Sequence, residues 1–397
     1  MNKKIIIPSV LCVAIVIAII ATCTGGGRKI KLEWNAQTAS DISRDSIELK
    51  VYVENSGSMD AYMCAGSNLK DAVFDYISDL NRLATSCSLN YINSKIIPYS
   101  GDLRSFIKDL TPASFARHGG DRRNTDLMQI IDTITKINNK DPKTVSVFVS
   151  DCILDIPQNA LDYLGNCQVS IKNTFIEAIK ANPRLGVEII KLESKFDGYW
   201  YCGHNRALLS NVKRPYYIWV IGDQRYLAKF NKMVPVEDII GGIKEYCAYA
   251  TSQPIPFDIE KSSYVVNHTG IINVNLLVNI SGSLQEKNVA KSLARFKSAN
   301  PSQVNIVSVN EITNTSSSYS HVIELEIENP ATLKTENITY SYPLLATWVS
   351  DSDDATGDNV MENLDKTTGL MSLIKGVSDA YKNSAEYGVI SFKLKNK

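Results

Sequence analysis

The apolar residues of this chain follow two kinds of pattern, and the change between them divides the sequence. In residues 46–252, short apolar runs alternate with segments whose apolar residues recur at the spacing of one helical face. The runs predict strands at 47–53, 145–149, 185–192 and 215–221, and the periodic segments predict helices beginning near 69, 127 and 171. Strands that alternate with helices are typical of an α/β domain with a doubly wound sheet.

A different pattern follows the linker Pro254-Ile255-Pro256. Apolar residues now alternate one by one with polar residues, as at 323–328 and 390–395, which predicts half-exposed strands. Helical spacing returns at 370–381. We therefore expect residues 257–397 to form a smaller β-rich domain, a sandwich of mostly antiparallel strands with one helix packed on it.

The N-terminal 23 residues predict export. Two lysines precede residues 5–22, which carry no charge and consist mainly of Ile, Val and Ala, so the segment is either a signal sequence or a transmembrane anchor. The sequence Ile20-Ala21-Thr22-Cys23 resembles the lipobox of bacterial lipoproteins, in which Cys23 is the lipidated residue. Both alternatives tether the protein to a membrane of the cell envelope. Both place its body outside the cytoplasm, in the periplasm or at the cell surface.

Residues 24–45 predict a tether, because they include three consecutive glycines and are mostly polar. Within this tether, Ile30, Leu32 and Trp34 alternate with charged residues. This alternation predicts a short edge strand.

Composition argues against a nucleic-acid partner and suggests disulfide bonds. Lys and Arg together number 42, as do Asp and Glu, so the formal net charge is zero and gives no electrostatic reason to bind nucleic acid. Six of the eight cysteines fall within residues 46–252. In an oxidising compartment we expect disulfides among these six, with Cys152 and Cys167 as a candidate local pair.

Oxygen-bearing side chains gather where three of the predicted elements begin or end. Glu54, Ser56 and Ser58 follow the first strand, Thr125 precedes the second helix, and Asp151 follows the second strand. Open α/β sheets bind ligands outside the carboxyl ends of their strands. Hydroxyl and carboxylate oxygens are ligands that Mg²⁺ accepts, usually together with several waters. We therefore expect a divalent-cation site at this edge of the sheet.

These segments resemble a von Willebrand factor A-type domain with its metal-ion-dependent adhesion site. The family pattern is Asp-x-Ser-x-Ser after the first strand, a Thr after a glycine-containing loop and an Asp at the end of a later strand. Ser56, Ser58, Thr125 and Asp151 match this pattern, whereas Glu54 stands where the family has Asp. The resemblance implies that the three hydroxyls hold Mg²⁺, Mn²⁺ or Ca²⁺ directly. It also implies that the two carboxylates hold the ion directly or through water, and that a carboxylate of a protein ligand completes the shell.

Two stretches beside this motif have alternative interpretations. Residues 194–214 are rich in aromatic side chains, including Tyr199, Trp200 and Tyr201, and predict an insertion that overhangs the site. The insertion serves either as a recognition surface or as a small hydrophobic core. Arg117, Arg122 and Arg123 precede Thr125 and predict a solvated loop in preference to a basic rim.

Three functions are open on the sequence alone. The first is a protein-binding module that uses the cation to engage an acidic ligand. The second is a metal-independent scaffold component of an envelope or secretion assembly, which Glu54 favours because its side chain is one methylene longer than that of Asp. The third is a metal-dependent hydrolase. The sequence offers no nucleophile with an evident base, so we expect a binding protein and not an enzyme.

Overall fold

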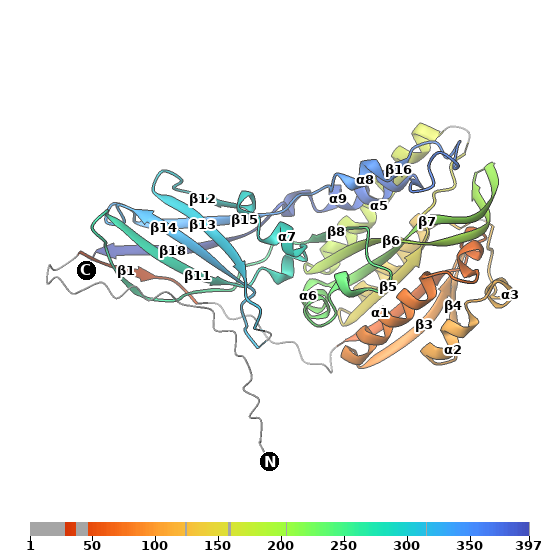
Figure 1. Ribbon diagram of the computed structural model, residues 1–397, viewed down its shortest axis with the longest axis horizontal. Helices are drawn as coiled ribbons and strands as arrows, with labels where there is room; N and C mark the ends of the chain where they lie inside the picture. The colour runs from red at the N-terminus through yellow and green to blue at the C-terminus, as the bar shows by residue number, and fades with distance from the viewer. Residues whose placement is uncertain are drawn as a thin grey trace, which may run out of the picture.

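The computed structural model describes residues 28–36, 47–123, 125–157, 160–203, 205–314 and 316–396. The predicted anchor, residues 1–23 with Cys23, lies outside these ranges. Within them, no helix has the length and apolar character needed to cross a membrane. The molecule is elongated, with a large sheet and its helices at one end and two smaller sheets at the other (Figure 1). We call these two parts the α/β body and the β body.

The α/β body is built on one mixed sheet with strand order β4-β3-β2-β5-β7-β6-β8. Its strands are β2 (Glu48–Glu54), β3 (Ser86–Ile92), β4 (Ile96–Tyr99), β5 (Thr144–Ser150), β6 (Leu185–Cys202), β7 (Asn205–Asp223) and β8 (Glu245–Ala250). β2 pairs in parallel with β3 and β5, whereas β4 and all strands beyond β5 pair antiparallel. The α/β class is confirmed, but the parallel arrangement stops at β5 because a hairpin returns the chain from β6 to β7.

Among the described residues, six helices and two short 3-10 helices between β2 and β8 accompany this sheet. They are η2 (Ser58–Met63), α1 (Leu69–Leu83), α2 (Leu103–Asp109), α3 (Pro112–Phe115), α4 (Leu127–Lys140), α5 (Ala160–Ala181), α6 (Gln224–Met233) and η3 (Val236–Asp238). The apolar stripes of α1 and α4 that the sequence predicts are buried. β5 is buried at every position, as expected for a strand covered on both faces.

The β body consists of two antiparallel sheets with strand orders β10-β1-β18-β15-β12 and β13-β14-β11-β9. Its strands are β1 (Lys29–Glu33), β9 (Phe257–Ile259), β10 (Ser263–Val265), β11 (Ile271–Val278), β12 (Phe296–Ser298), β13 (Val304–Glu311), β14 (His321–Glu328), β15 (Thr335–Ser341) and β18 (Glu386–Asn396). The apolar and polar residues that alternate in the sequence are alternately buried and more exposed in β14. Ile323, Leu325 and Ile327 are the buried ones.

β1 lies in the interior of its sheet and not at an edge. Lys31 pairs with Lys395 of β18 on one side and with Ser263 of β10 on the other. The edge prediction is wrong because alternation reports that one face of a strand is buried and says nothing of how many strands flank it.

The last helix, α9 (Leu370–Ala380), packs on the α/β body, where it lies against α5. Gly376 permits this close approach, since a Cβ at that position would lie 2.8 Å from the Cβ of Ile171. Tyr381, at the end of α9, donates a hydrogen bond to the carbonyl of Leu185 at 3.1 Å. We expected this helix to cover the sandwich, and that expectation is wrong. An apolar stripe shows that a helix is packed without showing on what.

The remaining short elements lie in the second half of the chain. They are η4 (Ser281–Ser283), α7 (Lys287–Ala290), η5 (Leu293–Arg295), α8 (Trp348–Asp351), β16 (Asp353–Asp354), β17 (Thr367–Thr368) and η6 (Lys382–Ser384). The six cysteines between residues 64 and 247 are free thiols, so Cys152 and Cys167 do not form the expected local disulfide.

Candidate functional site

The site lies where β2 and β5 end side by side. These strands are parallel neighbours, with Val53 opposite Val149, so Glu54 reaches the same edge of the sheet as Ser150. From β2 the chain passes to β3 on one side and later to β5 on the other. A crevice at such a change of direction is where open α/β sheets bind ligands.

Four of the five predicted residues form one hydrogen-bonded and electrostatically coupled cluster. Ser150 donates its hydroxyl hydrogen to Oε2 of Glu54. The hydroxyl oxygens of Ser56 and Ser58 lie 3.0 Å apart, and the side chains of Ser56 and Ser58 lower the pKa of Glu54 and of Asp151, respectively. The sequence therefore identifies a real spatial cluster and misses only Ser150.

Both carboxyl groups of this cluster are almost completely buried. Glu54 is 3% exposed and Asp151 is 2% exposed. Burial raises the pKa of both groups, and the negative charge of Asp151 raises the pKa of Glu54 further. Hydrogen bonds from Ser150 and Ser56 act in the opposite direction on Glu54. Two buried carboxylates that disfavour each other's ionisation form a favourable environment for a cation.

Two oxygen atoms of the predicted residues lack hydrogen-bond partners. Oδ2 of Asp151 and Oγ1 of Thr125 are buried, and neither has a partner within the described chain. Buried polar atoms are nearly always satisfied, so each such atom needs an explanation. Thr125 makes no hydrogen bond to the other four predicted residues, so it is the one predicted residue that the described contacts do not join to the cluster. This donor set fits a hard divalent cation.

The described residues contain no group of three or more His, Cys, Asp or Glu side chains arranged to hold a metal. A site made here would rest on two carboxylates and several hydroxyls. Mg²⁺ accepts one or two carboxylates and fills its shell with waters and other oxygens. Softer ions such as Zn²⁺, which favour Cys and His, do not match this set.

Arg122 holds the loop that carries the two serines. Its Nε donates to Oδ1 of Asn55 at 2.7 Å, its Nη2 donates to the carbonyl of Ser56 at 3.1 Å, and it forms an ion pair with Asp60. The backbone N–H of Gly57 in turn donates to the carbonyl of Arg122 at 3.1 Å. The prediction of a solvated loop is wrong for Arg122, whose side chain is only 18% exposed.

The aromatic stretch after residue 194 is the far end of a long hairpin made by β6 and β7. Tyr201 lies beside the site, since a Cβ on Gly57 would be 4.0 Å from Cε2 of Tyr201. The guanidinium carbon of Arg206 lies 3.6 Å from the ring centroid of Tyr199 and 5.6 Å from that of Tyr201. Both tyrosines are well exposed, so the hairpin places an aromatic and cationic surface next to the cluster.

The tip of this hairpin is fixed at two points. The backbone N–H of Gly203 donates to the side chain of Asp155, in the loop that follows Asp151. Nδ2 of Asn205 donates to the carbonyl of Gly357 at 2.9 Å. The predicted insertion is therefore a β ribbon held at its tip by these two hydrogen bonds.

Neither the family profiles, nor the curated proteins, nor the solved structures contain a match to this chain. The resemblance to A-type domains therefore rests on the motif and on the geometry described above.

His118 gives no support to a hydrolytic mechanism. Its ring stacks on Tyr91 with centroids 3.8 Å apart, and Nε2 lies 3.3 Å from Oδ2 of Asp109. The imidazole is thus engaged with residues other than the Glu54 and Asp151 cluster. A general base must lie within hydrogen-bond reach of the group that it activates.

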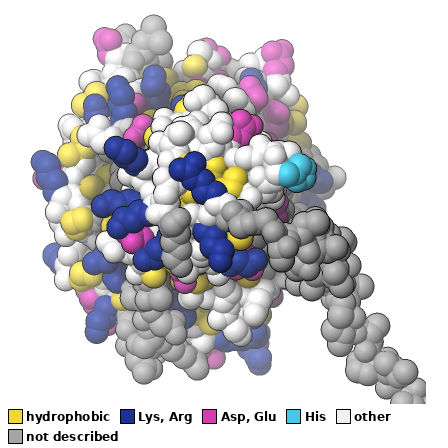
Figure 2. Space-filling view, turned by 90° about the vertical axis from the view of Figure 1, so that its left-hand side faces the viewer, with side chains coloured by type: hydrophobic (Ala, Val, Ile, Leu, Met, Phe, Trp, Pro, Cys, Tyr) yellow, Lys and Arg dark blue, Asp and Glu magenta, His cyan; other side chains and the backbone are white. Residues whose placement is uncertain are grey.

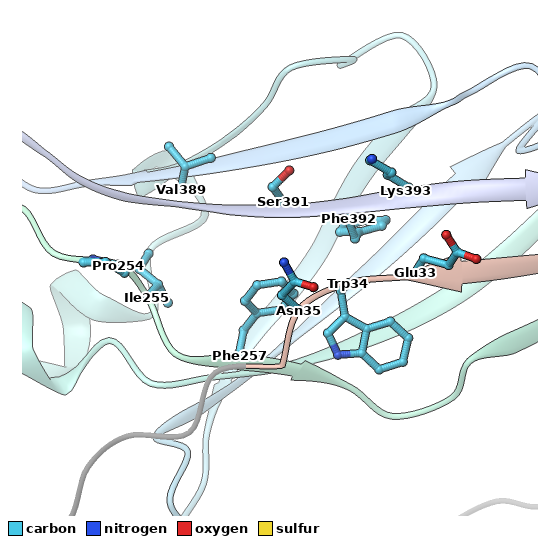
Figure 3. A pocket seen from close by; sticks show the side chains of 10 residues that line it. All are labelled: Glu33, Trp34, Asn35, Pro254, Ile255, Phe257, Val389, Ser391, Phe392 and Lys393. Carbon is cyan, nitrogen blue, oxygen red and sulfur yellow. The ribbon is translucent and has the colours of Figure 1, made fainter.

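A separate pocket of about 360 Å³ lies in the β body (Figure 3). Trp34, Phe257 and Phe392 contribute aromatic side chains, and Glu33 and Lys393 contribute charges at the rim. Its lining includes no residue of the predicted site, so the pocket is not the crevice at β2 and β5.

Proposed function

We propose that this protein is an extracytoplasmic, membrane-anchored binding module that engages an acidic group of a protein ligand through a divalent cation. The observation that carries this proposal is the pair of buried carboxyl groups of Glu54 and Asp151, with Oδ2 of Asp151 left without a partner. Burial of unpaired carboxylates is costly. Neither forms an ion pair with Lys or Arg in the described chain, and Arg214 acts on Asp151 only through its charge.

Ser56, Ser58 and Thr125 would hold the ion through their hydroxyls, and Glu54 and Asp151 directly or through water. A bound cation supplies positive charge that attracts a carboxylate of the ligand. Tyr201 and Arg206 beside the site supply additional contact area and charge for an acidic partner. The predicted N-terminal anchor supports placing this interaction at the surface of a membrane.

Calorimetric titration of the full chain in neutral detergent with Mg²⁺ and then Mn²⁺ tests this proposal. We expect saturable binding that Ser58→Ala and Asp151→Asn abolish. Ser88→Ala and Asp71→Asn, which alter exposed residues of the same types, are the matched controls and should bind as the unmodified protein does. Absence of binding in the unmodified protein would contradict the proposal, and so would equal loss in the controls.

A metal-independent scaffold is the second candidate, and one observation favours it. The hydrogen bonds from Ser150 and Ser56 to Glu54 stabilise a closed cluster within the protein itself. In that case the A-type arrangement is a structural framework and the partner binds elsewhere. Partner binding that persists in chelator and in Asp151→Asn would select this candidate over the first.

A further inference from the structure

The two outer faces of the β body carry opposite charge. One outer face is formed by the five-stranded sheet, and its solvent-facing charged residues are five lysines and two glutamates: Lys29, Lys31, Glu33, Lys297, Glu386, Lys393 and Lys395. We call it the basic face. The outer face of the four-stranded sheet carries Asp258, Glu324, Glu326 and Glu328, with no Lys or Arg on its strands. We call it the acidic face.

Strand register shows that each face holds like charges close together. Lys31 pairs directly with Lys395, and Glu33, their shared partner, lies 3.2 Å from Lys31 and 2.6 Å from Lys395. Like charges directly opposite each other on neighbouring strands destabilise a sheet. The basic face therefore keeps a net excess of positive charge at a cost to its own stability.

The acidic face has an excess of negative charge. Both central glutamates of β14 face neutral polar residues on the strands to either side. Glu326 is opposite Asn273 of β11 and Asn305 of β13. Glu324 is opposite Asn275 of β11 and Ser308 of β13. No described Lys or Arg forms an ion pair with either glutamate. Neutral amide and hydroxyl neighbours leave the row of carboxylates free to meet cations from another molecule.

The spacing of the two rows matches. Glu324, Glu326 and Glu328 alternate along β14, and Lys393 and Lys395 alternate along β18 in the same way. Side chains two residues apart on a strand repeat about every 7 Å, so both rows have the same period. Figure 2 faces this end of the molecule and shows Lys and Arg gathered mainly on its left-hand half, with Asp and Glu mainly at the upper right.

We propose that the β body mediates head-to-tail association of copies of this chain, in which the basic face of one copy packs on the acidic face of the next. Both halves of this interface are present on one molecule. Two different patches of the same chain form a heterologous contact, which closes into a ring or continues as a filament. The contact leaves the site at β2 and β5 open, so it is independent of the proposed cation-dependent binding.

Sedimentation velocity of the full chain in neutral detergent tests this proposal at two salt concentrations. At about 0.01 M salt the Debye length is about 30 Å, and at about 1 M it is about 3 Å. We expect assemblies of at least two copies at low salt and monomers at high salt. A protein that is monomeric at low salt would overturn the proposal.

Charge reversal identifies the surfaces involved. Lys29→Glu with Lys393→Glu removes the positive excess of the basic face and keeps the acidic face, and Glu324→Lys with Glu326→Lys removes the negative excess of the acidic face and keeps the basic face. We expect each double variant alone to be monomeric and an equimolar mixture of the two to associate again. Recovery in the mixture also demonstrates that both variants are folded. Lys140→Glu with Lys143→Glu, on the α/β body, is the control and should associate as the unmodified protein does.

Two results would overturn the assignment. In the first, reversal of either face leaves association unchanged, or the mixture stays monomeric. In the second, the unmodified protein stays monomeric while binding vesicles that contain anionic lipid through Lys29 and Lys393. The basic face would then serve a lipid surface and not a second copy.

Discussion

The hydroxyl of Ser150 donates a hydrogen bond to Oε2 of Glu54 and so joins the ends of two adjacent parallel strands. A serine at the buried end of a strand thus holds a buried carboxyl group in the crevice of the sheet. Glutamate reaches this donor from β2 with a side chain one methylene longer than the aspartate of the family pattern. The same carboxyl group lies beside Asp151, whose charge opposes its ionisation.

Replacement of Glu54 should separate stability from metal binding. Burial and the charge of Asp151 raise the pKa of Glu54 to about 8, so at pH 7 the folded protein must hold a proton that the unfolded chain has released. Glu54→Gln is neutral in both states and avoids this cost, so without metal at pH 7 we expect the free energy of unfolding to rise by on the order of 3 kcal/mol. Mg²⁺ binding should be lost in the same variant. Urea unfolding and calorimetry measure the two effects, with Glu48→Gln on the same strand as the control. A variant that is both destabilised and still able to bind Mg²⁺ would contradict this account.

Arg122 should be essential for the shape of the serine loop. Arg122→Gln removes hydrogen bonds to Asn55 and Ser56 and the ion pair with Asp60. We expect the free energy of unfolding to fall by about 2 kcal/mol, since hydrogen bonds to charged groups contribute about 1.5–3 kcal/mol each and this ion pair is partly solvent-screened. Mg²⁺ affinity should fall as well.

The control for Arg122 is its neighbour. Arg123→Gln alters an exposed guanidinium, so it should change stability by less than about 0.5 kcal/mol. Equal effects of the two substitutions would show that Arg122 acts only through general charge.

Glu188 should make stability depend on pH. Burial raises its pKa to about 7, although Asn231 and Tyr246 donate hydrogen bonds to it. The folded protein then binds a proton that the unfolded chain releases above its pKa of 4.5. Stability from this residue is complete below pH 4.5, declines as the pH rises towards 7, and is lost above it. The total loss is on the order of 3 kcal/mol.

Denaturant unfolding across this pH range checks the prediction. We expect the difference in free energy of unfolding between Glu188→Gln and the unmodified protein to shift in favour of the variant as the pH rises from 4.5 to 7. The effect of His321 on stability changes with pH in the opposite direction. Burial lowers the pKa of His321 to about 4, although the negative charge of Glu311 raises it. Its contribution is present in both proteins and cancels in the difference. A difference that is constant with pH would refute the assignment to Glu188.

Two glycines should respond to alanine in opposite ways. Gly376→Ala on α9 would place a Cβ 2.7 Å from the carbonyl oxygen of Gln168, so we expect a loss of about 1–3 kcal/mol as α9 is pushed away from α5. Gly165→Ala on α5 meets no atom within 4 Å and should stabilise the protein by about 0.5–1 kcal/mol through helix propensity. Thermal unfolding compares them, and a shift of the same sign in both would contradict the packing described for α9.

The sequence predicted those site residues that directly follow a recognisable strand. Glu54, Ser56 and Ser58 follow a strand whose apolar run is evident, and Asp151 follows another. Their convergence follows from the tendency of such strands to pair in parallel. Ser150 was predictable in principle, because a hydroxyl at the end of a strand buried on both faces requires a partner. Arg122 was not, since the three arginines of its loop look alike in sequence and only the fold turns one of them inward.

The predictions of the fold that were wrong concern which distant segments pack together. The alternation around Leu32 and the stripe around Leu373 specify a buried face on each element without specifying its neighbour. β1 pairs with β18, which lies more than 350 residues later in the chain, and α9 packs against α5. The antiparallel half of the large sheet was missed for a related reason, because the β6 and β7 strands continue through a polar stretch that we interpreted as a loop.

The position of β1 between β10 and β18 shows that the β body is formed from segments on both sides of the α/β sheet in the sequence. The first strand of the described chain pairs with its last, so residues 48–250, which contain the seven-stranded sheet, are an insertion between two strands of the β body. During synthesis β1 emerges first, yet its partner β18 emerges last. The five-stranded sheet can therefore close only after the α/β body has been made. A pull on the segment before Arg28 would load this sheet first and reach the crevice at β2 and β5 only through it.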